Sequence, residues 1–241
     1  MKISVAGGVV TGKRHALNGE ECQDFYLSVV DSSANRALIV VADGAGSKKY
    51  AKESAECVAE CMYELFASGL LTISSTREFL LEAINQKFSD MMLPADETGT
   101  TLLFIYICGN EFLTGHIGDG VIISDINDKF RVFSEPENGE MCFITFFVPT
   151  PDNNDTHFRL QRGTLNPDTS FVLATDGAAD LLYNSESCIV ATACDIIREW
   201  NIEMSSEACS KEIESSLKNL FSEYSDDDQT VAIISISADE F

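Results

Sequence analysis

Apolar runs separated by polar turns divide the first 70 residues into three strands and a helix. Strands are predicted at 3–10, 25–30 and 37–41, and the turn-rich stretch DSSANR separates the last two. Residues 11–23 are predicted to form a loop. A helix is predicted over 50–67, because its apolar residues recur every three or four positions and form one stripe. These residues are Ala51, Ala55, Val58, Met62 and Leu65.

A second helix is predicted to follow Ser75. Ser75 and Glu78 have the spacing of a capping box. The buried face is expected to consist of Phe79, Leu80, Ala83, Ile84 and Phe88.

The remainder of the chain is rich in strands. Apolar segments predict strands at 101–108, 112–117, 121–126, 130–133, 142–148, 170–174 and 229–237. The polar stretch PTPDNNDTHFRLQRG, at 149–163, is expected to be a surface loop. A helix is predicted at about 205–222, with its apolar residues on one face.

The order of these elements favours an α+β fold. Strands and helices do not alternate strictly, as they would in a doubly wound parallel sheet. Antiparallel sheets with helices packed on their outer faces fit the order better. No internal repeat, linker or low-complexity tract interrupts the chain, so residues 1–241 are expected to form one domain.

Charge and composition narrow the classes of function. The formal net charge of −23, from 16 basic and 39 acidic side chains, argues against nucleic-acid binding and against anionic membranes. An anionic substrate would need local positive charge, which a bound divalent cation supplies. The alternative is that the excess acid serves solubility. The chain lacks an apolar run long enough to span a bilayer, and its start lacks the apolar run of a signal peptide, so we expect a cytoplasmic protein.

The eight cysteines are expected to be free thiols at apolar positions. None belongs to a C-x-x-C pair, and Cys57 and Cys61 have no second Cys or His pair at zinc-site spacing.

Carboxylates recur where predicted strands end. Asp43, Asp119 and Asp176 are each followed by glycine, and residues 226–228 form an acidic run before the last strand. Carboxylates that converge from several strand ends repel one another unless a cation neutralises them, and an all-oxygen set suits Mg²⁺ or Mn²⁺ rather than Zn²⁺. Asp-Gly is also a common turn dipeptide. The residues alone leave both interpretations open.

Five segments in order resemble the metal-dependent type-2C protein serine/threonine phosphatases, and most closely their short bacterial branch. The segments are distributed in register over most of the chain. They are GKRHALNGEECQDFY, VVADGAGSKKYAKESAE, TGTTLLFIYICGNEFLTGHIGDG, FVLATDGAADLL and DDQTVAIIS.

The resemblance implies two antiparallel sheets packed as a sandwich, flanked by helices, with two or three Mn²⁺ or Mg²⁺ ions at one end. It implies that Asp43 bridges two ions and that the Gly44 carbonyl is a further ligand. Asp176 and Asp227 would complete the ligands of the first ion. Asp227 is preferred to Asp228 because it lies three residues before Thr230, as the family's aspartate does. The remaining implied ligands are Asp24, through water on the second ion, and Asp119, which would form a third site with Asp176.

The implied reaction is hydrolysis of phosphoserine and phosphothreonine. Two cations about 3.5–4 Å apart share a water, lower its pKa and take up phosphoryl charge, so no protein nucleophile is needed. Asp43 and Asp176 are the implied catalytic carboxylates, together with His15. The implied partners are a phosphorylated protein substrate and a cognate kinase or regulator.

The chain departs from the family pattern around the phosphate. Gly19 stands where family members often have an arginine, and Gln23 replaces the acidic residue that precedes the metal-shell aspartate. Ala45 stands where eukaryotic members have a histidine after Asp-Gly. The available phosphate-facing groups are therefore His15, which matches the short branch, and then Arg14.

Other polar groups are expected to be structural. His116 lies inside a predicted strand, and Lys48 and Lys49 are expected at an exposed helix start. The alternative for the two lysines is that they draw anions toward the site. The flap-like insertion of larger members is reduced to 149–169, and substrate selection is expected to lie either in this segment or in a partner.

Two alternatives remain beside the phosphoprotein phosphatase. One is a catalytically silent member that binds a phosphorylated partner, although every core aspartate is present. The other is a small-molecule phosphomonoesterase on the same fold.

Overall fold

The structure, a computed structural model, contains two five-stranded antiparallel sheets. It describes residues 1–126, 129–137, 145–152, 155–184, 186–187 and 189–237. In spatial order, the first sheet contains β1 (Lys2–Val10), β12 (Gln229–Ser237), β9 (Ser170–Ala174), β6 (Val121–Ser124) and β7 (Arg131–Ser134). The second contains β2 (Asp24–Asp31), β3 (Arg36–Asp43), β4 (Leu102–Cys108), β5 (Glu111–Ile117) and β8 (Arg159–Thr164).

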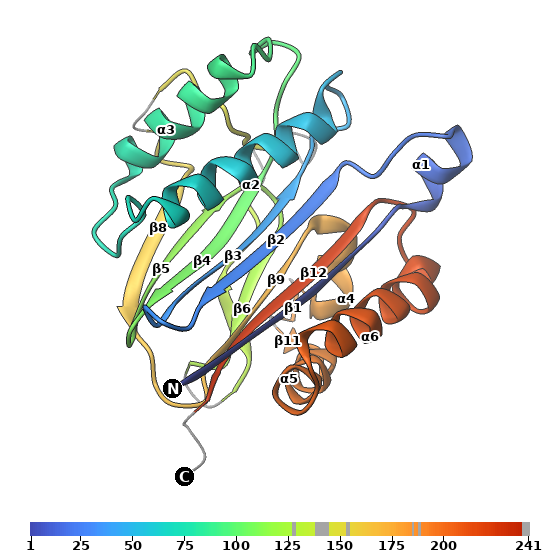
Figure 1. The fold of residues 1–241 in the computed structure, drawn as a ribbon. Coiled ribbons are helices and arrows are strands. Elements are labelled where there is room, and N and C mark those ends of the chain that lie inside the picture. The colour runs from blue at the N-terminus through green and yellow to red at the C-terminus, as the bar shows by residue number, and fades with distance from the viewer. Residues whose placement is uncertain (127–128, 138–144, 153–154, 185, 188, 238–241) are drawn as a thin grey trace.

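Helices cover the outer faces of both sheets, which gives four layers (Figure 1). One outer layer is formed by α2 (Ala51–Ala67) and α3 (Arg77–Asp90). The other contains α4 (Asp176–Leu182), α5 (Ala193–Glu203) and α6 (Ser206–Asn219). The remaining elements are α1 (Lys13–Asn18), the short ladder of β10 (Tyr183–Asn184) and β11 (Ile189–Val190), and the 3₁₀ turn η1 (Phe221–Glu223). The predicted α+β sandwich is confirmed.

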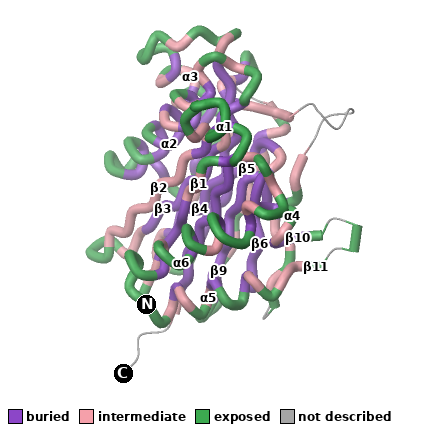
Figure 2. Tube along the Cα trace, turned by 90° about the vertical axis from the view of Figure 1, so that its right-hand side faces the viewer, coloured by how far each residue is buried: buried purple, intermediate pink, exposed green. Residues whose placement is uncertain are grey.

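Central strands are apolar throughout because both of their faces are covered. On β3, Leu38 and Val40 face the α2 and α3 layer, whereas Ile39 and Val41 face the other sheet. The strands are accordingly buried through the middle of the molecule, and exposed positions gather at its periphery (Figure 2).

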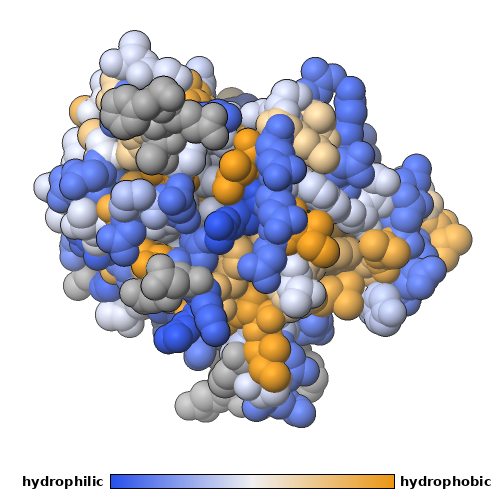
Figure 3. All heavy atoms as spheres, turned by 90° about the horizontal axis from the view of Figure 1, so that it is seen from below, coloured by the Kyte–Doolittle hydropathy of each residue, from blue (hydrophilic) through white to orange (hydrophobic). Residues whose placement is uncertain are grey.

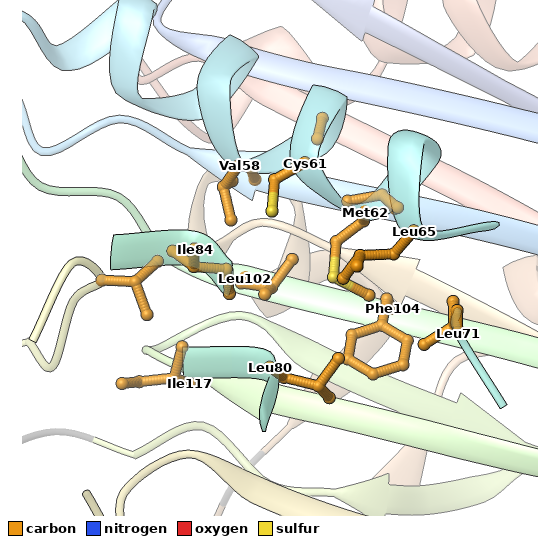
Figure 4. Packing of buried hydrophobic residues seen from close by; sticks show 14 of the residues in the cluster. Val58, Cys61, Met62, Leu65, Leu71, Leu80, Ile84, Leu102, Phe104 and Ile117 are labelled. Carbon is orange, nitrogen blue, oxygen red and sulfur yellow. The ribbon is translucent and has the colours of Figure 1, made fainter. Parts of the chain in front are cut away.

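The two helical layers are held by amphipathic faces. In one layer, side chains of α2 and α3 pack against β4 and β5 (Figure 4). They include Val58, Met62, Leu65, Leu80 and Ile84, which meet Leu102, Phe104 and Ile117. In the other layer, α5 and α6 cover β1 and β12 in the same way. Their buried side chains include Cys194, Ile197, Cys209, Ile213 and Leu217.

Several local predictions were wrong. Residues 11–23 contain α1, which ends at Gly19 in the left-handed conformation (φ 72°). The cap of α3 is Thr76, whose hydroxyl accepts the Phe79 N–H, so Ser75 and Glu78 do not form the cap. Leu81 is buried in place of Phe79, which is 36% exposed.

The other errors fall in the second half. The expected loop at 149–163 contains β8, which pairs with the edge of β5. Of the strand expected at 142–148, residues 142–144 lie outside the described residues, and Val148 makes an isolated bridge to Thr100. The helix α5 was not predicted from the sequence.

Among the described residues, none of the helices combines the length and the apolar character of a membrane span. Some apolar side chains remain exposed, among them Ile196 of α5 and Leu220 after α6. Seen from below, hydrophobic atoms form patches among hydrophilic ones (Figure 3). The six described cysteines are free, and four of them are buried.

Candidate metal centre at the ends of the sheets

Asp43 ends β3 in a fixed backbone position. Its N–H donates to the Thr101 hydroxyl (3.0 Å), and its carbonyl accepts from the Thr101 N–H (2.9 Å) and the Thr100 hydroxyl (2.9 Å). Asp24, the first residue of β2, lies directly opposite Asp43 in the ladder. A strand end with these bonds is a rigid mount for a carboxylate.

Two further carboxylates converge on Asp43 from other elements. Asp119 follows β5, and Asp176 is the first residue of α4, directly after β9 and Thr175. Oxygens of Asp43, Asp119 and Asp176 all lie within 4.8 Å of one another. The fold therefore joins three carboxylates that are 57 or more residues apart in the sequence.

The glycines after Asp43 and Asp176 are required by close backbone approach, not by a turn with positive φ. A Cβ on Gly44 would lie 2.2 Å from the Ala51 carbonyl oxygen, where α2 begins. A Cβ on Gly177 would lie 2.0 Å from the Asp228 carbonyl oxygen. The Asp-Gly pairs are thus places where a helix or the next strand packs against a strand end.

The electrostatics of this group are unfavourable without a cation. Burial and then the charges of Asp24, Asp176 and Asp119 raise the pKa of Asp43 well above its usual value. Burial, followed by the charges of Asp119 and Asp227, raises the pKa of Asp176 to about 6. Positive charge placed among these oxygens would remove this repulsion.

Asp24 is almost fully buried beside the group. The hydroxyls of Thr175 (2.8 Å) and Thr230 (2.7 Å) donate to its Oδ2. Its Oδ1 is buried and has no hydrogen-bond partner among the described residues. Burial is the main reason that the pKa of Asp24 is raised to about 7, and the two threonine hydroxyls oppose this shift.

Asp227 and Asp228 lie in different surroundings. Asp227 is 39% exposed at its side chain and pairs with Arg14 (Nη2 to Oδ1, 2.8 Å). The Asp228 carboxylate is buried and accepts from the Gly12 N–H (2.7 Å) and the Gln23 N–H (2.6 Å). Asp228 also accepts from His15 Nδ1 (2.9 Å).

Residues of α1 lie at the rim of the group. The Arg14 side chain is 58% exposed, whereas His15 is 5% exposed as a residue and its Nε2 lies 3.7 Å from Glu20 Oε2. Of the two basic groups named from the sequence, Arg14 is the accessible one. Lys48 and Lys49 are directed to the 96–97 turn, through the Asp96 carbonyl (2.9 Å) and Glu97 Oε2 (3.6 Å).

A cavity of about 150 Å³ opens on these side chains, and we refer to it as the acidic cavity. It is lined by Arg14, His15, Gln23, Asp43, Gly44, Ala45, Gly46, Asp119, Phe147, Asp176 and Asp227. Sequence reasoning missed Phe147 and also Thr145, whose hydroxyl donates to Asp119 Oδ2 (2.5 Å). The partners of Asp24 are Thr175 and Thr230. They belong to the same sequence motifs as Asp176 and Asp227, so the motifs were the signal that could have identified them.

The donor set fits a hard divalent cation. Its side chains offer carboxylate oxygens without a histidine or cysteine ligand among the three converging residues. The buried, unpartnered Asp24 Oδ1 adds a further oxygen beside Asp43.

Comparison with known proteins gives one family. Residues 11–221 match the family model described as "Protein phosphatase 2C". No curated protein matches the chain in sequence.

Solved structures share the fold at low sequence identity. A serine/threonine phosphatase of S. agalactiae is 17% identical, with a TM-score of 0.67 over 98% of this chain and 100% of that one. The catalytic domain of the serine/threonine phosphatase PstP, in complex with two manganese ions, is 16% identical, with a TM-score of 0.68 over 98% and 99%. RsbX in complex with magnesium is 18% identical, with a TM-score of 0.62 over 98% and 96%.

Proposed function

The chain belongs to the protein phosphatase 2C family, and we propose that it removes phosphate from phosphoserine and phosphothreonine in proteins with the help of divalent metal ions. The observation that carries this proposal is the convergence of Asp43, Asp119 and Asp176 at the sheet ends. Structural neighbours that contain manganese or magnesium support the use of such ions.

The proposed ligands are those implied by the family resemblance, and all of them except Asp24 line the acidic cavity. Asp43, Asp176, Asp227 and the Gly44 carbonyl would hold two ions. Asp24 would act through water, and Asp119 together with Asp176 would hold a third ion. Ions bound there would supply a water of lowered pKa and would offset the charge of the phosphoryl oxygens.

The chain's own residues would orient the phosphate. Arg14 is accessible at the rim, and its planar guanidinium can donate two parallel hydrogen bonds to phosphate oxygens. The buried His15 ring donates to Asp228, so its proposed contribution is to hold α1, and Arg14 with it, beside the cavity. In the reaction, water supplies the new P–O bond, and the serine or threonine oxygen leaves as the hydroxyl.

The surroundings of the reaction are also proposals. A phosphorylated protein is the proposed substrate, and a cognate kinase or regulator is the proposed partner. We further propose that residues 1–241 act as one domain and that the protein is cytoplasmic.

The test is a comparison of substrates with the Mn²⁺-loaded protein. We expect release of phosphate from phosphothreonine and phosphoserine peptides, and much slower release from sugar phosphates and nucleotides. Faster turnover of the small molecules would replace the proposal with a phosphomonoesterase. Loaded protein that binds phosphopeptides without hydrolysing them would be the catalytically silent alternative.

A further inference from the structure

A second cavity, of about 660 Å³, lies between α3 and the 147–151 segment. Its size is that of typical ligand pockets. We propose that it receives an apolar side chain of the phosphoprotein substrate, within about four residues of the phosphorylated one. This inference rests on the proposed function and adds to it a site that selects the substrate sequence.

The 147–151 segment joins the two cavities. Phe147 lines the acidic cavity, and Pro149 lines the second cavity. Residues two apart have Cα atoms within about 7 Å of each other, so the two cavities are close neighbours. Val148, between them, exchanges two backbone hydrogen bonds with Thr100 (2.9 Å each), and the Thr100 hydroxyl donates to the Asp43 carbonyl (2.9 Å).

A second connection between the two cavities runs through Ala45, Lys48 and Asp96. Ala45 lines the acidic cavity and accepts a hydrogen bond from the Lys48 N–H (2.8 Å). The Lys48 ammonium donates to the carbonyl of Asp96 (2.9 Å), and Asp96 lines the second cavity. An extended peptide advances about 3.3 Å per residue. A side chain two to four residues from the phosphorylated residue can therefore reach the second cavity.

The lining of the second cavity favours an apolar occupant. Phe88, Leu93, Ala95, Pro149 and Pro151 supply apolar surface. The remaining lining residues, Asn85, Ser89, Asp96 and Thr150, are polar, and the Lys48 ammonium lies beside Asp96. The substrate chemistry that fits the apolar part of the lining is an apolar residue in an extended segment.

The shape of the cavity is fixed by hydrogen bonds of its own wall. The Asn85 amide donates to the Thr150 carbonyl (2.8 Å) and accepts from the Thr150 N–H (3.2 Å). This pair ties the 147–151 segment to α3. The apolar surface is therefore held open in advance, which lowers the entropic cost of binding.

The experiment uses Mn²⁺-loaded protein and a set of phosphothreonine peptides. Each peptide carries leucine or aspartate at one of the four positions on either side of the phosphothreonine. We expect kcat/KM to be about 10-fold or more higher for leucine than for aspartate at one or more of these positions, which is the range for apolar pockets. Para-nitrophenyl phosphate, which has no flanking residues, serves as the reference substrate.

Two variants with the same charge change separate the cavity from a general effect. Ala95→Asp places a charge in the lining, and we expect it to abolish the leucine preference mainly through KM, with hydrolysis of para-nitrophenyl phosphate unchanged. Met92→Asp is the matched control, because Met92 is 87% exposed and does not line the cavity. Its φ of 55° is one that aspartate tolerates.

The outcomes are distinct. Equal kcat/KM across the peptides, or an equal loss of the preference in both variants, overturns the inference while the reference substrate shows that the phosphatase is active. Loaded protein that hydrolyses neither the reference substrate nor any peptide contradicts the proposed function, and the inference falls with it.

Discussion

The fold surrounds Asp228 and the nearby Asp43 cluster with different partners. Asp228 is buried and accepts hydrogen bonds from Gly12, His15 and Gln23. Asp43 and its neighbours instead face one another, and burial together with their mutual repulsion raises the pKa of Asp43. A carboxylate that serves structure is supplied with several protein donors. The Asp43, Asp119 and Asp176 cluster has few of them, Thr145 being one, and this shortage implies a ligand that brings positive charge.

Asp125 repeats the structural pattern away from the site. It directly follows β6 in the chain and is buried. Its carboxylate accepts hydrogen bonds from the Ser170 N–H (2.5 Å) and from Arg198 (2.9 Å). The fold can therefore pair a buried carboxylate where stability is concerned. The unpaired cluster at the sheet ends is the exception that calls for a function.

The strongest way to break this comparison is Asp43→Asn. The change keeps the volume but removes the proposed bridging charge, so we expect phosphopeptide hydrolysis to fall on the order of a thousandfold. Because one repelling charge is lost, the chelated variant should be at least as stable as the chelated wild type. Steady-state kinetics and thermal unfolding measure the two effects, and near-normal turnover would show that the metal assignment is wrong.

Asp228→Ala should have the opposite profile. The substitution leaves the Gly12 and Gln23 N–H groups and the His15 ring without their buried acceptor, so we expect a loss of about 3 kcal/mol in unfolding free energy. Urea unfolding of the chelated protein measures it. Unchanged stability with lost metal binding would place Asp228, and not Asp227, among the ligands.

His116 is a second buried polar group that the fold supplies with partners, and it makes the stability depend on pH. Its ring is buried, Arg159 donates to Nδ1 (3.1 Å), and Nε2 therefore donates to the Gly118 carbonyl (3.2 Å). The Ser134 hydroxyl also meets Nδ1 (2.8 Å), and Arg159 is paired in turn with Glu137. This neutral ring is satisfied by the fold, as Asp228 is.

Burial, and then the charge of Arg159, lower the pKa of His116 to about 3. The unfolded chain therefore binds the extra proton between pH 6.5 and 3, and stability is complete above pH 6.5 and falls as the pH is lowered. From pH 6.5 to 5 the loss is about 2 kcal/mol. The difference between wild type and His116→Asn in urea unfolding across this range isolates the effect, and parallel pH profiles would contradict it.

The smallest expected effect on stability belongs to Arg14→Ala. Its ion pair with Asp227 is exposed, so we expect less than about 1 kcal/mol of destabilisation. KM for a phosphopeptide should nevertheless rise about 10-fold, because a charge-assisted bond to phosphate is lost. Arg14→Lys is the matched variant and should recover part of the loss. Unchanged KM in both variants would exclude Arg14 from the phosphate site.

The sequence predicts the fold best where burial is two-sided or strictly periodic. The apolar runs of β3, β4 and β12 and the stripe of α2 were identified for this reason. In contrast, β8 reads RLQRGT and is half-exposed at a sheet edge, so only its non-local pairing with β5 reveals it as a strand. The αL residue Gly19 was the available mark of the six-residue α1.

The candidate site shows a similar limit. Asp43, Asp119 and Asp176 are visible because each ends an apolar run, and the sequence analysis named all three. Thr145 and Phe147 come from a distant segment without a motif, and their contacts arise only when that segment pairs with Thr100. Asp227 and Asp228 are chemically identical neighbours, and their difference depends on which of them meets Gly12 and Gln23.

The central claim is that the unpaired carboxylates at the sheet ends form a metal centre that drives phosphate ester hydrolysis. The most direct measurement is to titrate Mn²⁺ into the chelated protein and to record bound metal and phosphate release from a phosphothreonine peptide in the same samples. We predict that release is absent without metal, rises with occupancy, and is lost together with metal binding in Asp43→Asn. Full occupancy without release, or release from the chelated protein, would contradict the account.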